Sequence, residues 1–286
     1  MSASQQVIEL PHLRLAARVW GPEDGAPVLA LHGWLDNAST FERLAPRLPG
    51  CRIVAVDLPG HGRSDHRAHP TYYLLDYVAD ALAATAALGW SRFNLLGHSL
   101  GASVAALAAG TFPERVERLA LIEGLGPLAE EPEGAPQRLR GALERELRGV
   151  SREPRTYASV DEAAAARHRA TGLPLDAARL IVDRALEEVD GRWRWRTDPR
   201  LRWPSRLRLS ETQICAFLGA ITCPARLVVA DRGWSVDPEL AAARQACVRD
   251  LEIVRLSGGH HVHLEDPDAV AAAFAPFLGA PPSPAH

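Results

Sequence analysis

Hydrophobic and polar positions alternate along this chain in a way that separates short buried strands from amphipathic helices. Apolar runs bounded by turn residues are typical of buried strands, whereas apolar residues spaced three and four apart are typical of helices. Strands are predicted as a pair within residues 5–20, broken near Pro11, and at residues 27–31, 52–56, 93–96, 119–122, 227–230 and 251–256. Helices are predicted at residues 39–48, 74–88, 100–110 and 237–247, and after Ser210 and Pro267.

The order of these elements indicates an α/β fold with a doubly wound, mostly parallel, eight-stranded sheet, because parallel strands need crossovers between them. Composition changes after Pro127, where residues 128–209 become rich in Arg, Glu and Ala and contain no buried-strand run. The helical patterns of this region lie near residues 136–149, 159–170 and 176–188. We therefore predict a core formed by residues 1–127 and 210–286, with a helical insertion at 128–209 between the sixth and seventh strands.

A candidate nucleophile lies where one predicted strand meets the next helix. Residues 97–101 read Gly-His-Ser-Leu-Gly, between an apolar run and an alanine-rich helical segment. A G-x-S-x-G sequence on a strand-to-helix turn is typical of a nucleophile elbow, in which the glycines relieve crowding around a strained, exposed serine. Ser99 is therefore the predicted nucleophile.

Histidines that could activate this serine follow the last predicted strand. A serine hydroxyl is a weak nucleophile at neutral pH and needs a base, most often histidine. Residues 257–267 contain His260, His261 and His263. The three could instead bind a metal, but adjacent and i,i+3 histidines in a loop, without a cysteine or a partner motif, favour the base.

The composition of the chain argues against several classes of function. The formal net charge of -3 gives no general attraction to nucleic acid or to an anionic membrane. The chain has no lysine, so all 32 basic residues are arginine and Schiff-base catalysis is excluded. The four cysteines form no C-x-x-C pair and are expected to be reduced. The first ten residues lack a signal-peptide pattern and no run reaches membrane-spanning length, so a cytoplasmic protein acting on a small molecule is expected.

Four motifs, taken in chain order, resemble those of the α/β-hydrolase fold superfamily, in particular its serine-hydrolase-like branch with a helical cap domain. They are His-Gly-Trp at residues 32–34, the loop 57–64, the elbow 97–101 and the segment 259–267, which begins Gly-His. The resemblance covers nearly the whole chain. It implies that residues 128–209 form the cap, and that the protein needs no metal or organic cofactor.

The resemblance also assigns roles to individual residues. Within the family the histidine that follows the glycine is the base, which places this role on His260, with Glu265 five residues further on. It implies that His261 and His263 are structural, and that His98 neighbours the nucleophile without transferring a proton. The oxyanion hole is expected from the backbone N–H groups of Trp34 and Leu100.

The third member of the triad departs from the family pattern. The usual acid stands in a Gly-x-x-Asp turn after the penultimate strand, but residues 230–233 read Ala-Asp-Arg-Gly, with glycine at the acid position. Some family members carry the acid one strand earlier, where this chain has Glu123. We expect Glu123 to be the acid, with Asp231 as the runner-up, and Asp237 to cap a helix.

The expected activity is hydrolysis of a carboxylic ester, or of an amide or thioester, through an acyl-enzyme on Ser99. Serine in the elbow argues against dehalogenase or epoxide-hydrolase chemistry, which in this family use aspartate there. A catalytically silent small-molecule binding protein on the same fold is the alternative. The Arg/Trp segment at residues 192–208 is expected to brace the cap, or else to select acidic or aromatic substrates.

Overall fold

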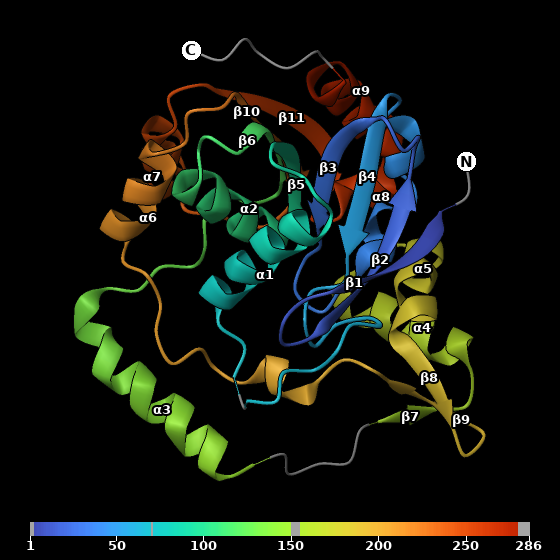
Figure 1. Ribbon diagram of the computed structural model, residues 1–286. Helices are drawn as coiled ribbons and strands as arrows, with labels where there is room; N and C mark the ends of the chain where they lie inside the picture. The colour runs from blue at the N-terminus through green and yellow to red at the C-terminus, as the bar shows by residue number, and fades with distance from the viewer. Residues whose placement is uncertain (1–2, 70, 150–154, 280–286) are drawn as a thin grey trace.

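The structure is a computed structural model that describes residues 3–69, 71–149 and 155–279. Eight strands form one sheet in the order β1-β2-β4-β3-β5-β6-β10-β11 (Figure 1). β1 and β2 pair antiparallel, and the strands from β4 to β11 pair in parallel with one another. The predicted α/β fold with a mostly parallel sheet is confirmed. The strands are β1 (Ser4–Glu9), β2 (Arg14–Trp20), β3 (Ala26–Leu31), β4 (Cys51–Val56), β5 (Phe93–His98), β6 (Val116–Ile122), β10 (Ala225–Arg232) and β11 (Leu251–Gly259).

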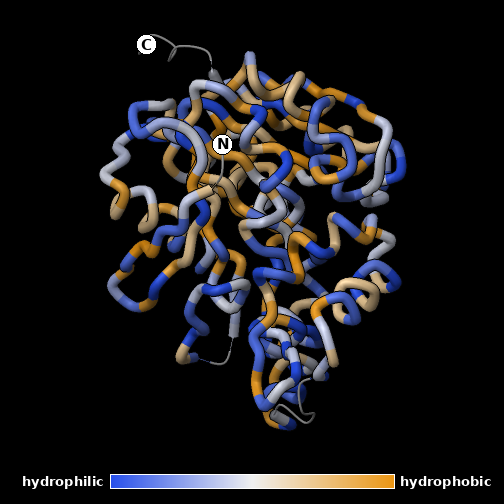
Figure 2. Tube along the Cα trace, turned by 90° about the vertical axis from the view of Figure 1, so that its right-hand side faces the viewer, coloured by the Kyte–Doolittle hydropathy of each residue, from blue (hydrophilic) through white to orange (hydrophobic). Residues whose placement is uncertain are grey.

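The central strands are buried on both faces. In β3, Leu29 and Leu31 belong to the hydrophobic cluster on one face of the sheet, whereas Val28 and Ala30 belong to the cluster on the other. Hydrophobic segments accordingly run through the interior of the molecule in Figure 2. Burial on both faces makes such strands read as continuous apolar runs, which is why their positions are visible in the sequence.

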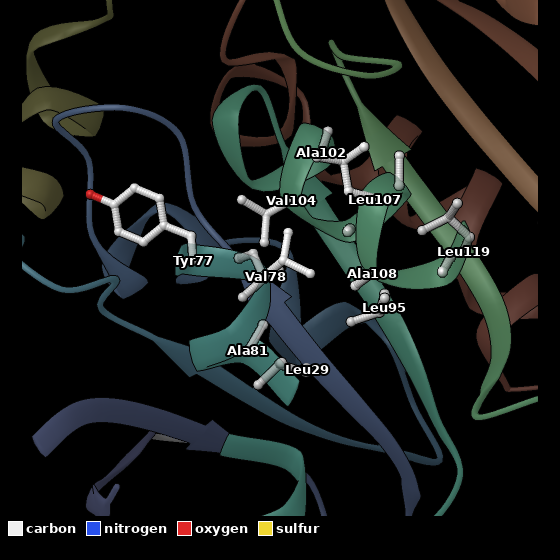
Figure 3. Packing of buried hydrophobic residues seen from close by; sticks show 14 of the residues in the cluster. Leu29, Tyr77, Val78, Ala81, Leu95, Ala102, Val104, Leu107, Ala108 and Leu119 are labelled. Carbon is white, nitrogen blue, oxygen red and sulfur yellow. The ribbon is translucent and has the colours of Figure 1, made fainter. Parts of the chain in front are cut away.

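Helices cover both faces of the sheet. Helices α1, α2 and α6 contribute to the first cluster, and α9 contributes to the second. Figure 3 shows Val78 of α1 and Val104 of α2 packed with Leu29 and Leu95 of the sheet. The helices of the core are α1 (Leu74–Ala87), α2 (Leu100–Thr111), α6 (Glu211–Gly219), α7 (Pro238–Cys247), α8 (Val262–Glu265) and α9 (Pro267–Leu278).

The continuous helix predicted for residues 39–48 is wrong. This part of the chain forms two short 3₁₀ helices, η1 (Ala38–Phe41) and η2 (Ala45–Arg47). The Asn37 side chain accepts a hydrogen bond from the Ser39 N–H, so capping occurs two residues earlier than predicted. Pro46 has no backbone N–H to donate, which prevents one uninterrupted α-helix here.

Residues 128–209, called the inserted segment below, lie between β6 and α6. The three predicted helices are present, but a small sheet with the order β7-β9-β8 accompanies them. The insertion is mostly helical, as expected, and this small sheet is an addition that was not predicted from the sequence. The elements of the segment are η3 (Pro132–Gly134), α3 (Ala135–Leu147), β7 (Thr156–Tyr157), α4 (Val160–Thr171), α5 (Leu175–Ala185), β8 (Leu186–Val189), β9 (Arg192–Trp195) and η4 (Pro199–Arg202).

A hairpin explains this difference. The helix predicted for residues 176–188 ends at Ala185, and β8 and β9 then pair antiparallel. Asp190 and Gly191 between them have φ values of 51° and 72°, as a tight hairpin turn of the mirror-image type requires. An Asp-Gly pair before the alternating Arg-Trp-Arg-Trp run is itself a hairpin signal in the sequence.

The sequence predicts a disordered, proline-rich tail at residues 279–286, and residues 280–286 lie outside the described residues. Within the described ranges, none of the helices combines the length and the apolar character needed to cross a bilayer.

Candidate active site

Ser99 occupies a tight turn between β5 and α2. Its φ and ψ are 52° and -111°, a conformation that non-glycine residues rarely adopt. A Cβ on Gly97 would lie 2.5 Å from the Gly101 carbonyl oxygen, and a Cβ on Gly101 would lie 2.0 Å from the Leu31 carbonyl oxygen. Both glycines are therefore required by close backbone packing, and the predicted elbow has the strained geometry that presents a nucleophile.

Glu123 stands beside Ser99 at the end of the neighbouring strand. The Ser99 N–H donates to the carbonyl oxygen of Ile122, the last residue of β6, at 2.9 Å. Glu123 also has a positive φ, of 54°. Its side chain is 2% exposed, and its Oε2 lies 3.1 Å from Nδ1 of His260. The structure thus brings these two predicted site residues together at the carboxyl edge of the sheet.

Hydrogen bonds keep the Glu123 carboxylate charged in this buried position. The Ala230 N–H donates to Oε1 at 2.6 Å, and the Trp234 N–H donates to Oε2 at 2.7 Å. Burial alone would raise the pKa of Glu123, but the hydrogen bonds from His260 and the two backbone N–H groups outweigh it and lower the pKa below its usual value.

Gly233 explains why the turn after β10 departs from the family pattern. A Cβ on Gly233 would lie 1.9 Å from Oε2 of Glu123. The space at the usual acid position is therefore filled by a carboxylate that reaches it from the adjacent strand. Only glycine fits beside it.

Asp231 points elsewhere. Its Oδ1 accepts a hydrogen bond from the Gly258 N–H at 2.9 Å and its Oδ2 accepts one from the Ser257 hydroxyl at 3.1 Å. The carboxylate is exposed, and it stabilises the chain just before the histidine loop. The prediction that Asp237 caps a helix is confirmed, because its side chain accepts hydrogen bonds from the first turn of α7.

His260 is held over the elbow from two sides. Its backbone carbonyl oxygen lies 2.8 Å from Nε2 of His98, the residue before Ser99, and its ring centroid lies 5.9 Å from that of Trp234. Its side chain is 26% exposed, so it remains accessible. The Ser99 hydroxyl makes no hydrogen bond within the described parts of the chain. Such nucleophile–base bonds are often long without substrate and tighten in the complex.

The three histidines of the loop face different partners rather than one common ligand. His260 faces Glu123, and Nε2 of His263 lies 2.7 Å from the Thr40 hydroxyl. Nε2 of His261 lies 3.0 Å from Oδ2 of Asp36. This divergence disfavours a metal site made of the three histidines.

Asp36 is a buried site residue that the sequence pattern does not single out. Its side chain is 2% exposed and pairs with Arg167 of α4 as well as with His261. Burial alone would raise the pKa of Asp36, but the charges of His261 and Arg167 hold it well below its usual value of 3.8. The only feature of the sequence that could have indicated Asp36 as a site residue is its position just after the His-Gly-Trp motif.

His98 lies between these two carboxylate–histidine pairs. Because a carbonyl oxygen only accepts, the contact with His260 places the His98 hydrogen on Nε2. Burial lowers the pKa of His98 to about 4, so the ring is neutral at pH 7 and Nδ1 carries a lone pair. Asp36, His98 and His261 offer donor atoms within 4.8 Å of one another. The guanidinium of Arg167 already balances the Asp36 charge, which opposes a cation there.

Trp34 and Leu100, the expected oxyanion donors, flank the elbow. Neither backbone N–H has a hydrogen-bond partner in the part of the chain that the structure describes. Both residues line a cavity of about 120 Å³, together with residues of α1 and of the inserted segment. The Trp34 indole N–H donates to the Leu201 carbonyl oxygen at 3.1 Å, which ties η4 to the core. Ser99 and His260 themselves are outside the lining of this cavity, which adjoins the elbow through Leu100.

The Arg/Trp segment contains residues that brace the insertion. Arg194 and Arg196 both pair with Glu187, within the β8–β9 hairpin. The Trp195 indole N–H donates to the Tyr157 hydroxyl at 3.1 Å. These contacts stabilise the inserted segment itself, and they do not test the expectation that the segment braces the cap against the sheet.

Known proteins similar to this chain share its fold and its length. A profile described as "alpha/beta hydrolase fold" matches residues 26–267. A serine hydrolase-like protein from Danio rerio is 33% identical over 289 residues, covering 97% of this chain and 89% of the relative. A crystal structure of a hypothetical protein from Pseudomonas aeruginosa PAO1 has a TM-score of 0.92 at 47% identity, covering 98% of this chain and 100% of that chain. The thioesterase domain from the curacin biosynthetic pathway has a TM-score of 0.86 at 27% identity, covering 96% and 99% of the two chains.

Proposed function

This chain belongs to the α/β hydrolase fold family, in its serine-hydrolase-like branch, and from that membership we propose that it is a serine hydrolase. Its reaction is the cleavage of a carboxylic ester, or of an amide or thioester, through an acyl-enzyme on Ser99. The observation that carries the proposal is the 3.1 Å contact of Glu123 with Nδ1 of His260, beside a strained serine elbow.

Glu123 and His260 prepare the serine for attack. An anionic Glu123 accepts the hydrogen on Nδ1 of His260, which leaves a lone pair on Nε2. Nε2 removes the proton from the Ser99 hydroxyl as its oxygen attacks the carbonyl carbon of the substrate. Glu123 stabilises the imidazolium that forms, without taking its proton.

The backbone N–H groups of Trp34 and Leu100 receive the negative charge that develops on the carbonyl oxygen. The imidazolium of His260 then donates its proton to the leaving group, and the acyl-enzyme remains. A water molecule, deprotonated by His260, attacks this ester and releases the carboxylic acid and the free serine. Neither N–H group has a hydrogen-bond partner among the described residues, and this supports their assignment as the oxyanion hole.

The inserted segment acts in this proposal as the cap of the site, with the core formed by residues 1–127 and 210–286. The cavity beside the elbow supports this assignment, because its walls come from both the core and the inserted segment. Trp34, a core residue, hydrogen-bonds the inserted segment at Leu201. A substrate in this cavity therefore contacts both the core and the inserted segment.

Labelling with a fluorophosphonate probe tests the proposal. The wild-type protein is expected to react. Ser257→Ala, a control that removes an exposed hydroxyl just before the histidine loop, is expected to react equally. Ser99→Ala is expected to be unreactive and to hydrolyse 4-nitrophenyl esters at least about 1,000-fold more slowly, with an unchanged circular dichroism spectrum. Wild-type protein that neither reacts nor hydrolyses such esters would support the silent binding protein. Full turnover by Ser99→Ala would exclude Ser99 as the nucleophile.

A further inference from the structure

Arginines of the inserted segment differ in whether their charge is already balanced. Arg194 and Arg196 pair with Glu187, Arg200 pairs with Asp198 at 2.6 Å, and Arg206 pairs with Glu146 at 2.5 Å. The guanidinium of Arg202, by contrast, makes no hydrogen bond or ion pair within the described ranges of the chain. Its guanidinium carbon lies 6.0 Å from the centroid of the Trp34 ring, and the residue is exposed.

Contacts with residues of the proposed active site hold the turn that carries Arg202. Trp34, on whose ring the guanidinium rests, is 52% exposed and supplies one of the proposed oxyanion donors. The hydrogen bond from the Trp34 indole to the Leu201 carbonyl oxygen holds the residue next to Arg202 in place. The 3₁₀ helix η4 is further anchored by the Asp198 N–H, which donates to the Gly60 carbonyl oxygen at 2.9 Å. The cation therefore stands on a fixed turn rather than on a free loop.

The lining of the cavity beside the elbow also favours a negatively charged ligand. Arg200 and Arg206 are among its lining residues, and no aspartate or glutamate of the described chain is. Arg202 itself is not a lining residue, but its guanidinium lies against Trp34, which is one. Because Asp198 and Glu146 balance the two lining arginines, Arg202 supplies a positive charge beside the cavity that no ion pair within the described ranges balances.

We propose that the substrates of this site carry a carboxylate, and that Arg202 is the residue that recognises it. The inference rests on the proposed hydrolase function and names its substrate class. A guanidinium that rests on an aromatic ring keeps its N–H edge free, and that edge matches the two oxygens of a carboxylate. Arg202 acts here as a specificity determinant and takes no part in bond making or breaking.

The test compares two esters that differ only in a terminal charge, mono-4-nitrophenyl adipate and 4-nitrophenyl hexanoate. The wild-type protein is expected to favour the adipate monoester in kcat/KM. Arg202→Gln is expected to lower the adipate-to-hexanoate ratio by about two- to fivefold, mainly through KM, because an exposed charge pair contributes modestly. Arg202→Lys should keep part of the preference, and added salt should reduce it in the wild type.

Arg194→Gln is the matched control, since it removes an arginine whose charge is already balanced within the hairpin, and it should leave the ratio unchanged. An unchanged ratio in Arg202→Gln, or an equal fall in Arg194→Gln, would overturn the inference while leaving the hydrolase function intact. If the wild type hydrolyses neither ester, the hydrolase proposal fails, and calorimetric binding of adipate to the wild type and to Arg202→Gln then decides the inference. Binding of adipate that does not weaken in Arg202→Gln would refute it.

Discussion

Two adjacent histidines of the loop after β11 each face a buried carboxylate, and the two pairs are nearly equal in geometry. His260 lies 3.1 Å from Glu123, and His261 lies 3.0 Å from Asp36. Both carboxylate side chains are 2% exposed. The distances and the burial of the carboxylates therefore do not distinguish the two pairs.

The other partners of each carboxylate do distinguish them. Glu123 accepts hydrogen bonds from two backbone N–H groups and pairs with no arginine among the described residues, so its charge is left to favour an imidazolium on His260. Asp36 pairs with Arg167, which already supplies a positive charge. The His260 side chain is also 26% exposed, against 12% for His261. A carboxylate–histidine pair thus becomes suited to catalysis or to structure according to what else the carboxylate binds.

The largest expected difference between the pairs is in catalysis. Glu123→Gln keeps the shape of the side chain but removes the charge that stabilises the imidazolium, and kcat should fall by about 1,000- to 10,000-fold. Asp36→Asn should lower kcat far less, because the partners of Asp36 are His261 and Arg167, whereas the proposed base is His260. Steady-state kinetics on a 4-nitrophenyl ester measures both. Comparable losses of kcat in folded samples of the two variants would contradict the distinction.

The next difference is in stability. Asp36→Asn leaves Arg167 buried without its counter-charge, and the free energy of unfolding should fall by about 3–5 kcal/mol. Urea unfolding followed by tryptophan fluorescence measures the loss. The double variant Asp36→Asn with Arg167→Met should recover part of it, because both charges are then absent. A loss below about 1 kcal/mol, or no recovery in the double variant, would show that the pair is not a structural link.

Lowering the pH should reduce the stability contributed by both carboxylates, and at low pH the reduction should be larger for Asp36. Their pKa values are lowered by folding, so each contributes stability that is present above its unfolded value and is lost as pH falls through its folded value. Below about pH 3.8, the unfolding free energy of the wild type should fall faster than that of Asp36→Asn, by up to about 1.4 kcal/mol per pH unit. Parallel pH profiles for the two proteins would contradict the depressed pKa.

The smallest effect is expected at Asp231, the carboxylate that faces neither histidine. Asp231→Asn removes a charge from an exposed group whose partners are Gly258, Ser257 and the exposed Arg232, so kcat should change by less than about threefold and stability by less than about 1 kcal/mol. The same kinetic and urea measurements apply. If Asp231→Asn were nearly inactive and Glu123→Gln active, the acid would be Asp231.

Several features were readable from local sequence because local physics decides them. Strands buried on both faces appear as apolar runs, and a serine between two glycines at a strand end marks the elbow. The Asp-Gly turn of the β8–β9 hairpin carried an equally local signal, and the helix predicted for residues 176–188 missed it because the helical pattern before it is strong. The choice of Glu123 over Asp231 rested on strand order in a resembling family.

The sequence by itself determined the class of fold, the elbow around Ser99 and the loop that carries His260, because each depends on neighbouring residues and on strand-to-helix succession. Only the tertiary structure decided which carboxylate faces which histidine. Arg167 reaches Asp36 across 131 positions of the chain, and Glu123 reaches the turn at Gly233 because β6 and β10 are neighbours in the sheet. Such partners meet through packing of distant elements, and no local pattern records them.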